Sequence, residues 1–578
     1  MSPRGRNQTP LWGFFLNAPL WLPLGLFFGV GLLLVFLGSG NYGLYLDDYV
    51  HKALATMIPG GGFRRDYPLI ESQVRQFGQM LLFPMSYLVS YQEWAARTVQ
   101  LVLHGLTFVL FGALVYRLLR SVLAAACALL FLAFAFPAFE SWLWMATIHL
   151  AAANILAFLV AHLWLSGIES EKRPVFWLLA AVVLFGLIQP FYEQPMVILG
   201  ALPLLALAKD FGRARFRRVA WRSLPVILAG LLITALNWYF FLRHSIHALR
   251  RMSLSAAQAP FLERLGNSFK GGFSFCYHLR PFALEAFDLG MLTGSTSLGF
   301  CLLLGSGILA LIWAVHRVSA TKEEARAASP LWPWLLAGFL WWAFARIPSM
   351  LGGFQASRLE LVPLFGLAFM LGAVVQRLSW RMPSLRRLAV LGLGTLCLFN
   401  IVALAGLVKA HAELFERDGV ALSAIVRAIP DPPQAAIFLP LSVDTRYGRT
   451  PLPPQIESRL LYIFFVDWSL SPALQVAYER PDLGGLGKIP WNDGKIGRLT
   501  EDESGRVTEL FMDETRIPIE KLVPFQYRDG RVWGIDPLTV SVPEEGRKWI
   551  VHPPALRDAA SRGLPLVPGN LELRQQAP

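Results

Sequence analysis

Two adjacent carboxylates, Asp47 and Asp48, are the residues of this chain best suited to acid–base chemistry. They follow the apolar segment Leu20–Leu37 by a few residues, and His51 comes three residues later. Carboxylates this close disfavour each other's charged form, which suits a group that takes a proton from a hydroxyl. We therefore expect a general base here, although a solvated loop or a helix cap would also explain an isolated Asp-Asp pair.

Three further polar features border apolar segments, where charged side chains are costly and therefore informative. Glu140 and His149 flank a Trp-rich stretch, which an interfacial aromatic belt would also explain. Glu193 lies in a tight turn between two prolines. Arg346 and Arg358 lie between two apolar segments, with Gln355 and Glu360 beside them. These types of side chain are suited to binding hydroxyl and phosphate groups.

The elements that must position these residues are apolar helices. The chain is 55% hydrophobic and 16% charged, and its mean hydropathy is +0.47, which is too apolar for an ordinary soluble domain. A spanning helix needs about 20 mostly apolar residues, and about eleven segments qualify as candidates. They are Leu20–Leu37, Val99–Tyr116, Val122–Pro137, Met145–Trp164, Val175–Ile188, Met196–Ala208, Leu224–Phe241, Met291–Val315, Leu331–Ala345, Leu359–Val375 and Leu388–Val408.

Basic residues recur in every second loop between these segments, which predicts the orientation of the chain. If the segments alternate across the membrane, these residues all fall on one side, which is the cytoplasm by the positive-inside rule. They are Arg4, Arg6, Arg117, Arg120, Lys172, Arg173, Lys209, Arg213, Arg215, Arg217, Arg218, Arg222, Arg317, Lys322, Arg326, Arg377, Arg381, Arg386 and Arg387. The net charge of +13 is thereby explained without a nucleic-acid partner. The same charge pattern places the N-terminus in the cytoplasm, and an odd number of spans then places the C-terminal domain outside, most simply at a bacterial inner membrane.

The polar features described above all fall on the predicted outer side. Two long outer loops, 38–98 and 243–290, lie on the same side. The second loop carries Arg243 and Arg280 against the charge rule. Long loops follow that rule weakly, so these arginines either have no special meaning or bind an anionic group such as a lipid phosphate.

After residue 410 the composition becomes polar, which predicts a membrane domain over 1–410 and a separate domain over 411–578 with an α+β or mostly β fold. Three short runs favour strands: Ala436–Leu439, Leu461–Val466 and Leu474–Tyr478. Asp529-Gly530 between two further runs predicts a two-residue hairpin. The domain shows no metal cluster, phosphate loop or nucleophile motif, so its sequence assigns it no role.

The order of these motifs resembles the GT-C superfamily of membrane glycosyltransferases. Its members carry Asp-Asp or Asp-Glu just after the first helix, as Asp47-Asp48 do here. The stretch Glu140–Asn154 is similar to the "E-S-x-x-W … A" segment of protein O-mannosyltransferase-like and TMTC-like members, but Thr147–Leu150 replaces their Gly-Arg-x-Asp. Tyr192-Glu193-Gln194 matches a Lys-Glu-x segment without its Lys, and Arg358 with Pro363 matches a late Arg-x-x-x-Pro.

The resemblance covers roughly Leu20 to Val408 and implies an all-α polytopic fold and an inverting sugar transfer. The donor would be a polyprenyl-phosphate-linked sugar, and the acceptor a glycan, lipid or protein hydroxyl, with membrane lipids around the protein. Asp47 and Asp48 would be catalytic, with Asp47 as the base. The substrate-binding residues implied are His51, Glu140, His149, Glu193, Arg243, Arg280 and Arg358. Some members use a divalent cation and others none, so the cofactor stays open.

Three other functions remain in view. An O-antigen ligase or polymerase also has many spans and a basic outer loop, but its main soluble part lies between helices. A transporter or flippase of lipid-linked glycan would favour internal repeats and charges at mid-span. A scaffold of envelope assembly would use the C-terminal domain alone. Replacing Asp47 by Asn separates a transferase, which would lose activity, from a scaffold, which would not.

Overall fold

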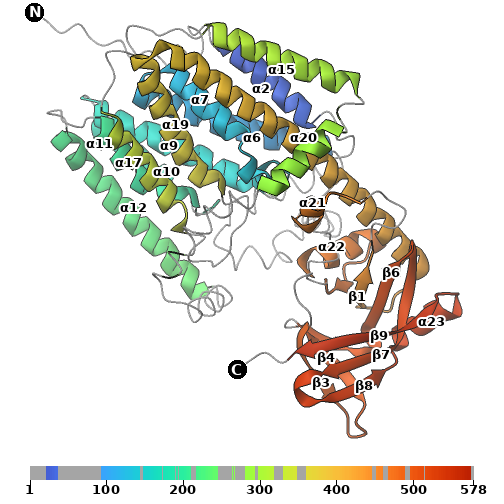
Figure 1. Ribbon diagram of the computed structural model, residues 1–578. Coiled ribbons are helices and arrows are strands. Elements are labelled where there is room, and N and C mark those ends of the chain that lie inside the picture. Colours follow the sequence, from blue (N-terminus) through green and yellow to red (C-terminus); the bar gives the residue numbers. More distant parts are fainter. Residues whose placement is uncertain are drawn as a thin grey trace, which may run out of the picture. The chain divides into compact units, whose positions relative to one another are not determined.

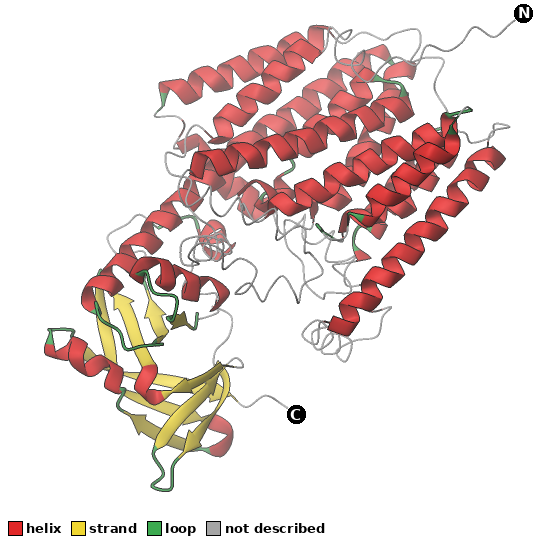
Figure 2. Ribbon diagram, turned by 180° about the vertical axis from the view of Figure 1, so that it is seen from behind, coloured by secondary structure: helices red, strands yellow, loops and turns green. Residues whose placement is uncertain are grey.

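A computed structural model describes most of the chain. The residues that it describes are 21–36, 93–143, 147–171, 173–188, 191–192, 194–209, 216–244, 280–292, 297–317, 330–347, 360–444, 451–459, 467–487, 495–512 and 515–574, with a few isolated residues besides. They fall into two compact units, and the boundary between the units falls between Lys409 and Ala410. Figure 1 follows the chain from blue to red, and Figure 2 shows that the strands all belong to the C-terminal unit.

The first unit is helical. The apolar helices are α2 (Trp21–Phe36), α6 (Glu93–Leu119), α7 (Val122–Ala133), α9 (Ile148–Glu169), α10 (Pro174–Gly186), α11 (Ile198–Lys209), α12 (Phe216–His244), α15 (Leu298–Arg317), α17 (Leu331–Phe344), α19 (Leu361–Arg381) and α20 (Pro383–Ala428). The last of these helices, α20, continues past Lys409 into the second unit. The short elements η2 (Phe136–Ala138) and α8 (Glu140–Leu143) precede α9, and η4 (Gln194–Val197) leads into α11. Each apolar segment of the sequence thus coincides with a helix.

Six of the described helices are long and apolar enough to cross a membrane, and these belong to α6, α9, α12, α15, α19 and α20. The other five are apolar but shorter. A helix of 12 residues such as α7 is only about 18 Å long, whereas a bilayer core is about 30 Å thick. Six of the eleven predicted spans are therefore supported by helices of sufficient length, and the other five coincide with shorter apolar helices, so the count of eleven is not confirmed.

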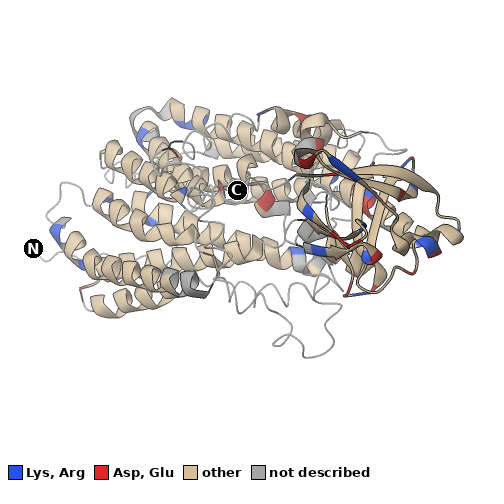
Figure 3. Cartoon of the chain, turned by 90° about the horizontal axis from the view of Figure 1, so that it is seen from below, with Lys and Arg blue, Asp and Glu red and all other residues tan. Residues whose placement is uncertain are grey.

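Aromatic side chains fill the centre of the helical unit. Phe111 of α6, Phe158 of α9, Trp341 of α17 and Phe365 of α19 pack against one another with ring centroids 4.8 to 6.4 Å apart. The opposite faces of several helices expose large apolar side chains, including Leu228 of α12 at 57% exposure. An apolar core inside an equally apolar outer surface is what a lipid environment requires. Figure 3 shows most of the helical ribbon in tan, with Lys and Arg mainly toward helix ends.

Glycines let two pairs of helical segments approach closely. Gly338 of α17 and Gly366 of α19 face each other, and a Cβ added to Gly366 would lie 2.6 Å from the Gly338 carbonyl oxygen. A Cβ on Gly406 of α20 would lie 1.9 Å from the carbonyl oxygen of Ala286, in the helical residues 280–292. Contacts of this kind between small residues hold helices together where no hydrophobic effect does so.

The C-terminal unit is an α+β domain with nine described strands. They are β1 (Ile437–Val443), β2 (Gly484–Gly485), β3 (Lys495–Glu501), β4 (Val507–Met512), β5 (Thr515–Pro518), β6 (Leu522–Arg528), β7 (Arg531–Val542), β8 (Arg547–Val551) and β9 (Leu566–Arg574). The order across the sheet is β2-β1-β6-β7-β9-β3-β4-β5, and β8 pairs with the second half of β7. Helices α21 (Pro454–Arg459), α22 (Asp467–Tyr478) and α23 (Arg557–Ser561) complete the unit.

Two strand predictions are confirmed and one is wrong. Ala436–Leu439 falls on β1, and the predicted hairpin joins β6 to β7, with Asp529 and Gly530 both at positive φ as a type I′ turn requires. Leu474–Tyr478 is helical instead, because it forms the end of α22. There Leu470, Ala473 and Leu474 are buried at helical spacing. The run Leu461–Val466 lies outside the described residues.

Candidate functional site

A buried polar stripe runs along α6. Arg97, Gln100, His104 and Thr107 follow one another at intervals of three or four residues and therefore share one face of the helix. All four are at most 8% exposed. Polar side chains that face the interior of an apolar bundle are expensive, and they mark either helix contacts or a functional site.

The stripe is bonded to the region before α9. Arg97 donates to the Gln100 side-chain oxygen at 3.1 Å, and Gln100 donates to the carbonyl of Ser141 in α8 at 3.1 Å. Thr147 donates to the same carbonyl at 3.2 Å. One turn further down, the Thr107 hydroxyl lies 3.2 Å from the carbonyl oxygen of Ala151 in α9. The N-terminal ends of α6 and α9 are thereby fixed to each other.

The start of α9 contacts the segment that precedes α11. The His149 ring packs against Tyr192, with centroids 5.0 Å apart. Gln194, two residues after Tyr192, is fully buried and donates to the carbonyl of Ala345 at 3.1 Å. Ala345 directly follows α17, so this hydrogen bond joins the N-terminal end of α11 to the C-terminal end of α17.

A buried ion pair then joins α17 to α19. Arg346 binds Glu360 through two N–O contacts of 3.1 and 2.5 Å, and both side chains are almost fully buried. The guanidinium also lies over the Trp342 ring, 4.8 Å from its centroid.

These contacts, linked by residues that are one or two positions apart in the chain, form a series that we name the Arg97–Glu360 cluster. Its members are Arg97, Gln100, Ser141, Thr147, His149, Tyr192, Gln194, Arg346 and Glu360. They come from the ends of α6, α9, α11, α17 and α19 that lie at one end of the bundle. The cluster places hydrogen-bond donors, a histidine and a neutralised arginine inside an apolar unit, where polar groups interact strongly.

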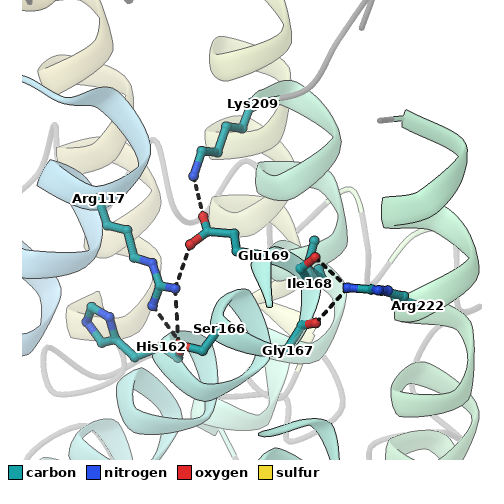
Figure 4. A network of polar contacts seen from close by, with 8 residues as sticks. All are labelled: Arg117, His162, Ser166, Gly167, Ile168, Glu169, Lys209 and Arg222. Carbon is teal, nitrogen blue, oxygen red and sulfur yellow. Dashed lines mark hydrogen bonds and ion pairs between the residues drawn. The ribbon is translucent and has the colours of Figure 1, made fainter. Parts of the chain in front are cut away.

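A second polar group, the Glu169 network, lies at the other end of α9 (Figure 4). Its carboxylate contacts Arg117 of α6 at 2.8 Å and Lys209 of α11 at 2.5 Å. Arg117 also donates to the His162 carbonyl at 2.8 Å and the Ser166 hydroxyl at 3.1 Å. Arg222 of α12 donates to the carbonyls of Gly167, Ile168 and Ser170, which close the C-terminal end of α9. The network ties four helices together, and each of its three cationic side chains has an acceptor within it.

The structure describes the side chains of three predicted site residues. His149 belongs to the Arg97–Glu360 cluster. Glu140 is partly buried at the start of α8, next to Ser141 of that cluster. Arg280 begins the helical residues 280–292 and is exposed. Asp47, Asp48, His51, Glu193 and Arg358 lie outside the described residues, and Arg243 is described in its helix α12 but not in its side chain.

Sequence reasoning missed Arg97 and Gln100. The predicted span begins at Val99, so Arg97 falls just outside it and Gln100 is its second residue, where a polar side chain draws no attention. Their recurrence with His104 and Thr107 at intervals of three or four residues could have indicated a shared polar face of the helix. The spacing between Gln194 and Ala345 carried no such signal, because their contact joins residues that are 151 apart in the chain.

The described residues contain no group of three or more His, Cys, Asp or Glu side chains placed to hold a metal ion. Comparison with known proteins adds no assignment. No protein-family model matches this sequence, and no curated protein matches it. The function therefore rests on the residues and their geometry.

Proposed function

We propose that this protein is an integral membrane glycosyltransferase that uses a polyprenyl-phosphate-linked sugar. The observation that carries the proposal is the Arg97–Glu360 cluster. Three of the four polar features singled out in the sequence, at Glu140–His149, Tyr192–Gln194 and Arg346–Glu360, are connected there by direct contacts or adjacent residues. Chain regions far apart in sequence thus form one polar end on an apolar bundle, which suits a lipid-linked substrate.

The fourth feature, Asp47-Asp48, follows α2 and supplies the proposed base. All eleven apolar helices are proposed to cross the membrane, the five shorter ones within the bundle. Helix α7 illustrates how a short helix is accommodated, because nine of its 12 residues are buried by its neighbours rather than facing lipid. With the N-terminus in the cytoplasm, this arrangement places the Arg97–Glu360 cluster and the C-terminal unit on the outer side.

The proposed reaction is a single displacement. The Asp47 carboxylate takes the proton of the acceptor hydroxyl, and the acceptor oxygen forms a bond to the anomeric carbon from the face opposite the phosphate. The bond from that carbon to the phosphate oxygen breaks, and its electron pair stays on the lipid phosphate. Arg358, with Arg243 or Arg280, stabilises that anion, since arginine binds phosphate through two N–H groups. The anomeric configuration inverts.

In this proposal the cluster positions the reactants rather than carrying out the chemistry. His149 and Glu140 lie in or beside it and would bind the sugar hydroxyls, with His51, Asp48 and Glu193 completing the site. Arg346 is already neutralised by Glu360, so its role is to hold α17 and α19 together rather than to bind phosphate. The choice between a metal-dependent and a metal-free reaction is settled by adding a chelator to the assay.

The test is transfer of radiolabelled sugar from polyprenyl-phosphate donors in membranes, with wild type and Asp47→Asn. We expect label in an acceptor with wild type and a loss of at least about 100-fold in the variant, the usual contribution of a general base. The matched control is Asp529→Asn in the β6–β7 hairpin, where Asn also accepts the positive φ. Full activity of Asp47→Asn would move the base elsewhere, and absence of transfer with any donor would contradict the proposed reaction.

A further inference from the structure

A pocket on the C-terminal unit lies between β3 and the β7–β8 connection. Its volume is about 300 Å³, at the lower end of the range for small-ligand sites. The lining residues are Gly497, Arg498, Leu499, Glu501, Val542, Glu545 and Arg547. Among the described residues, β9 pairs with β3 only at Lys495 and Ile496. The pocket begins at the next residue of β3, where this pairing has ended.

One side of the pocket is held rigid by Glu501. Its carboxylate accepts a hydrogen bond from the Trp549 indole at 2.8 Å and contacts the Arg547 guanidinium at 3.0 Å. Arg547 in turn lies over the Trp549 ring, 4.7 Å from its centroid. The guanidinium is therefore fixed in place while its side chain stays 57% exposed, which lowers the entropic cost of binding a ligand.

The other side presents Arg498. Its guanidinium lies 5.0 Å from the centroid of the Phe511 ring, on the neighbouring strand β4. Within the part of the chain that the structure describes, Arg498 has no carboxylate partner. The aromatic ring thus supports the guanidinium without occupying its N–H groups.

We propose that this pocket binds a neutral carbohydrate unit. The acceptor of the proposed transfer reaction would then be a carbohydrate. Two arginines and two glutamates are among its lining residues, so their formal charges cancel and a phosphate gains little net attraction. A sugar hydroxyl donates to a carboxylate and accepts from a guanidinium at once, so a polyhydroxylated ligand satisfies both kinds of group. The Leu499 and Val542 side chains supply a small apolar surface, too little to anchor a peptide by a buried hydrophobic side chain.

Sugar binding by this pocket does not depend on the proposed transfer reaction. Only the identification of the bound sugar as the acceptor rests on the proposed function. The experiment is saturation-transfer NMR of the full-length protein in detergent with maltotriose, cellotriose, mannotriose and chitotriose as separate probes. We expect at least one trisaccharide to bind, and Arg498→Gln or Glu545→Gln to weaken it about tenfold or more, as for lost hydrogen bonds to charged groups.

Arg516→Gln is the matched control, because Arg516 pairs with Glu509 on β5 and β4 outside the pocket. Binding should be unchanged there. Absence of binding by all four trisaccharides, equal binding by Arg498→Gln, or preferential binding of inorganic phosphate or of an acidic peptide would each overturn the proposal. Sugar binding without any measurable transfer would contradict the proposed function but would leave the proposal of a sugar-binding pocket intact.

Discussion

At the scale of single residues, the Arg346–Glu360 pair is the contact that matters most for the candidate site. Both charges are removed from solvent, and the attraction between them compensates for that loss only while both are present. Removing one partner leaves a buried charge without compensation. Replacing both by apolar groups removes the problem, because the surroundings are already apolar.

We therefore expect Glu360→Leu alone to destabilise the protein by roughly 3–5 kcal/mol, and Arg346→Met with Glu360→Leu to recover most of the loss. Thermal unfolding of the purified protein in detergent measures both variants. The exposed pair Arg516–Glu509 is the control, where Arg516→Met should cost no more than about 1 kcal/mol. A single variant as stable as wild type would show that the buried pair does not form.

Whether a site residue can be predicted from the sequence depends on how unusual it is in its local sequence. Arg346, Glu360 and His149 interrupt apolar sequence, and the cost of such interruptions draws attention to them. Arg97 and Gln100 sit at the border of an apolar segment, where polar residues are ordinary. Their burial follows from the packing of α6 against α8 and α9, which no local pattern specifies.

At the scale of elements, the close approach of α20 to residues 280–292 depends on Gly406. The backbone of Ala286 occupies the space that any side chain at this position would need. Gly392 lies in the same helix with nothing within 4 Å of an added Cβ. The two glycines therefore separate the effect of packing from the effect of helix propensity.

Gly406→Ala should force α20 away from residues 280–292 and lower the melting temperature, because a Cβ there would lie 1.9 Å from a backbone oxygen. Gly392→Ala should leave the melting temperature unchanged or raise it, since alanine favours a helix by up to about 1 kcal/mol over glycine. Both variants are compared by thermal unfolding in detergent. Equal melting temperatures for the two variants would contradict the close contact.

The helices were predictable and the strands less so. A long apolar segment can adopt few structures other than a helix, and each of the segments predicted here coincides with one. Leu474–Tyr478 was assigned as a strand from five apolar-rich residues, too short a window to reveal the helical spacing that begins at Leu470. The parallel pairing of β7 with β9 joins residues more than 20 apart and has no local signature at all.

At the scale of the whole molecule, the orientation of the chain is a direct prediction. Glu171 follows α9 on the predicted cytoplasmic side, and Ser561 belongs to α23 of the C-terminal unit; both residues are exposed. In the predicted topology four spans precede Glu171 and eleven precede Ser561, so seven spans separate the two positions and put them on opposite sides of the membrane.

In a variant with all four cysteines replaced, Ser561→Cys should react with a membrane-impermeant maleimide in sealed, right-side-out membranes. Glu171→Cys should react only after the membranes are opened with detergent. Labelling is read by gel shift of the full-length protein. Reaction of both positions before the membranes are opened, or of Glu171→Cys alone, would contradict the proposed orientation.

The Glu169 network also has a consequence for how the chain is made. A ribosome delivers Arg117 first, Glu169 next, and Lys209 and Arg222 only after α10 and α11 have been synthesised. The carboxylate can therefore pair with one cation as soon as it emerges, while the carbonyls at the end of α9 wait for the final arginine. The order of synthesis thus sets the order in which these contacts can form, and a nascent chain that stalls before Arg222 lacks the side chain that closes that helix end.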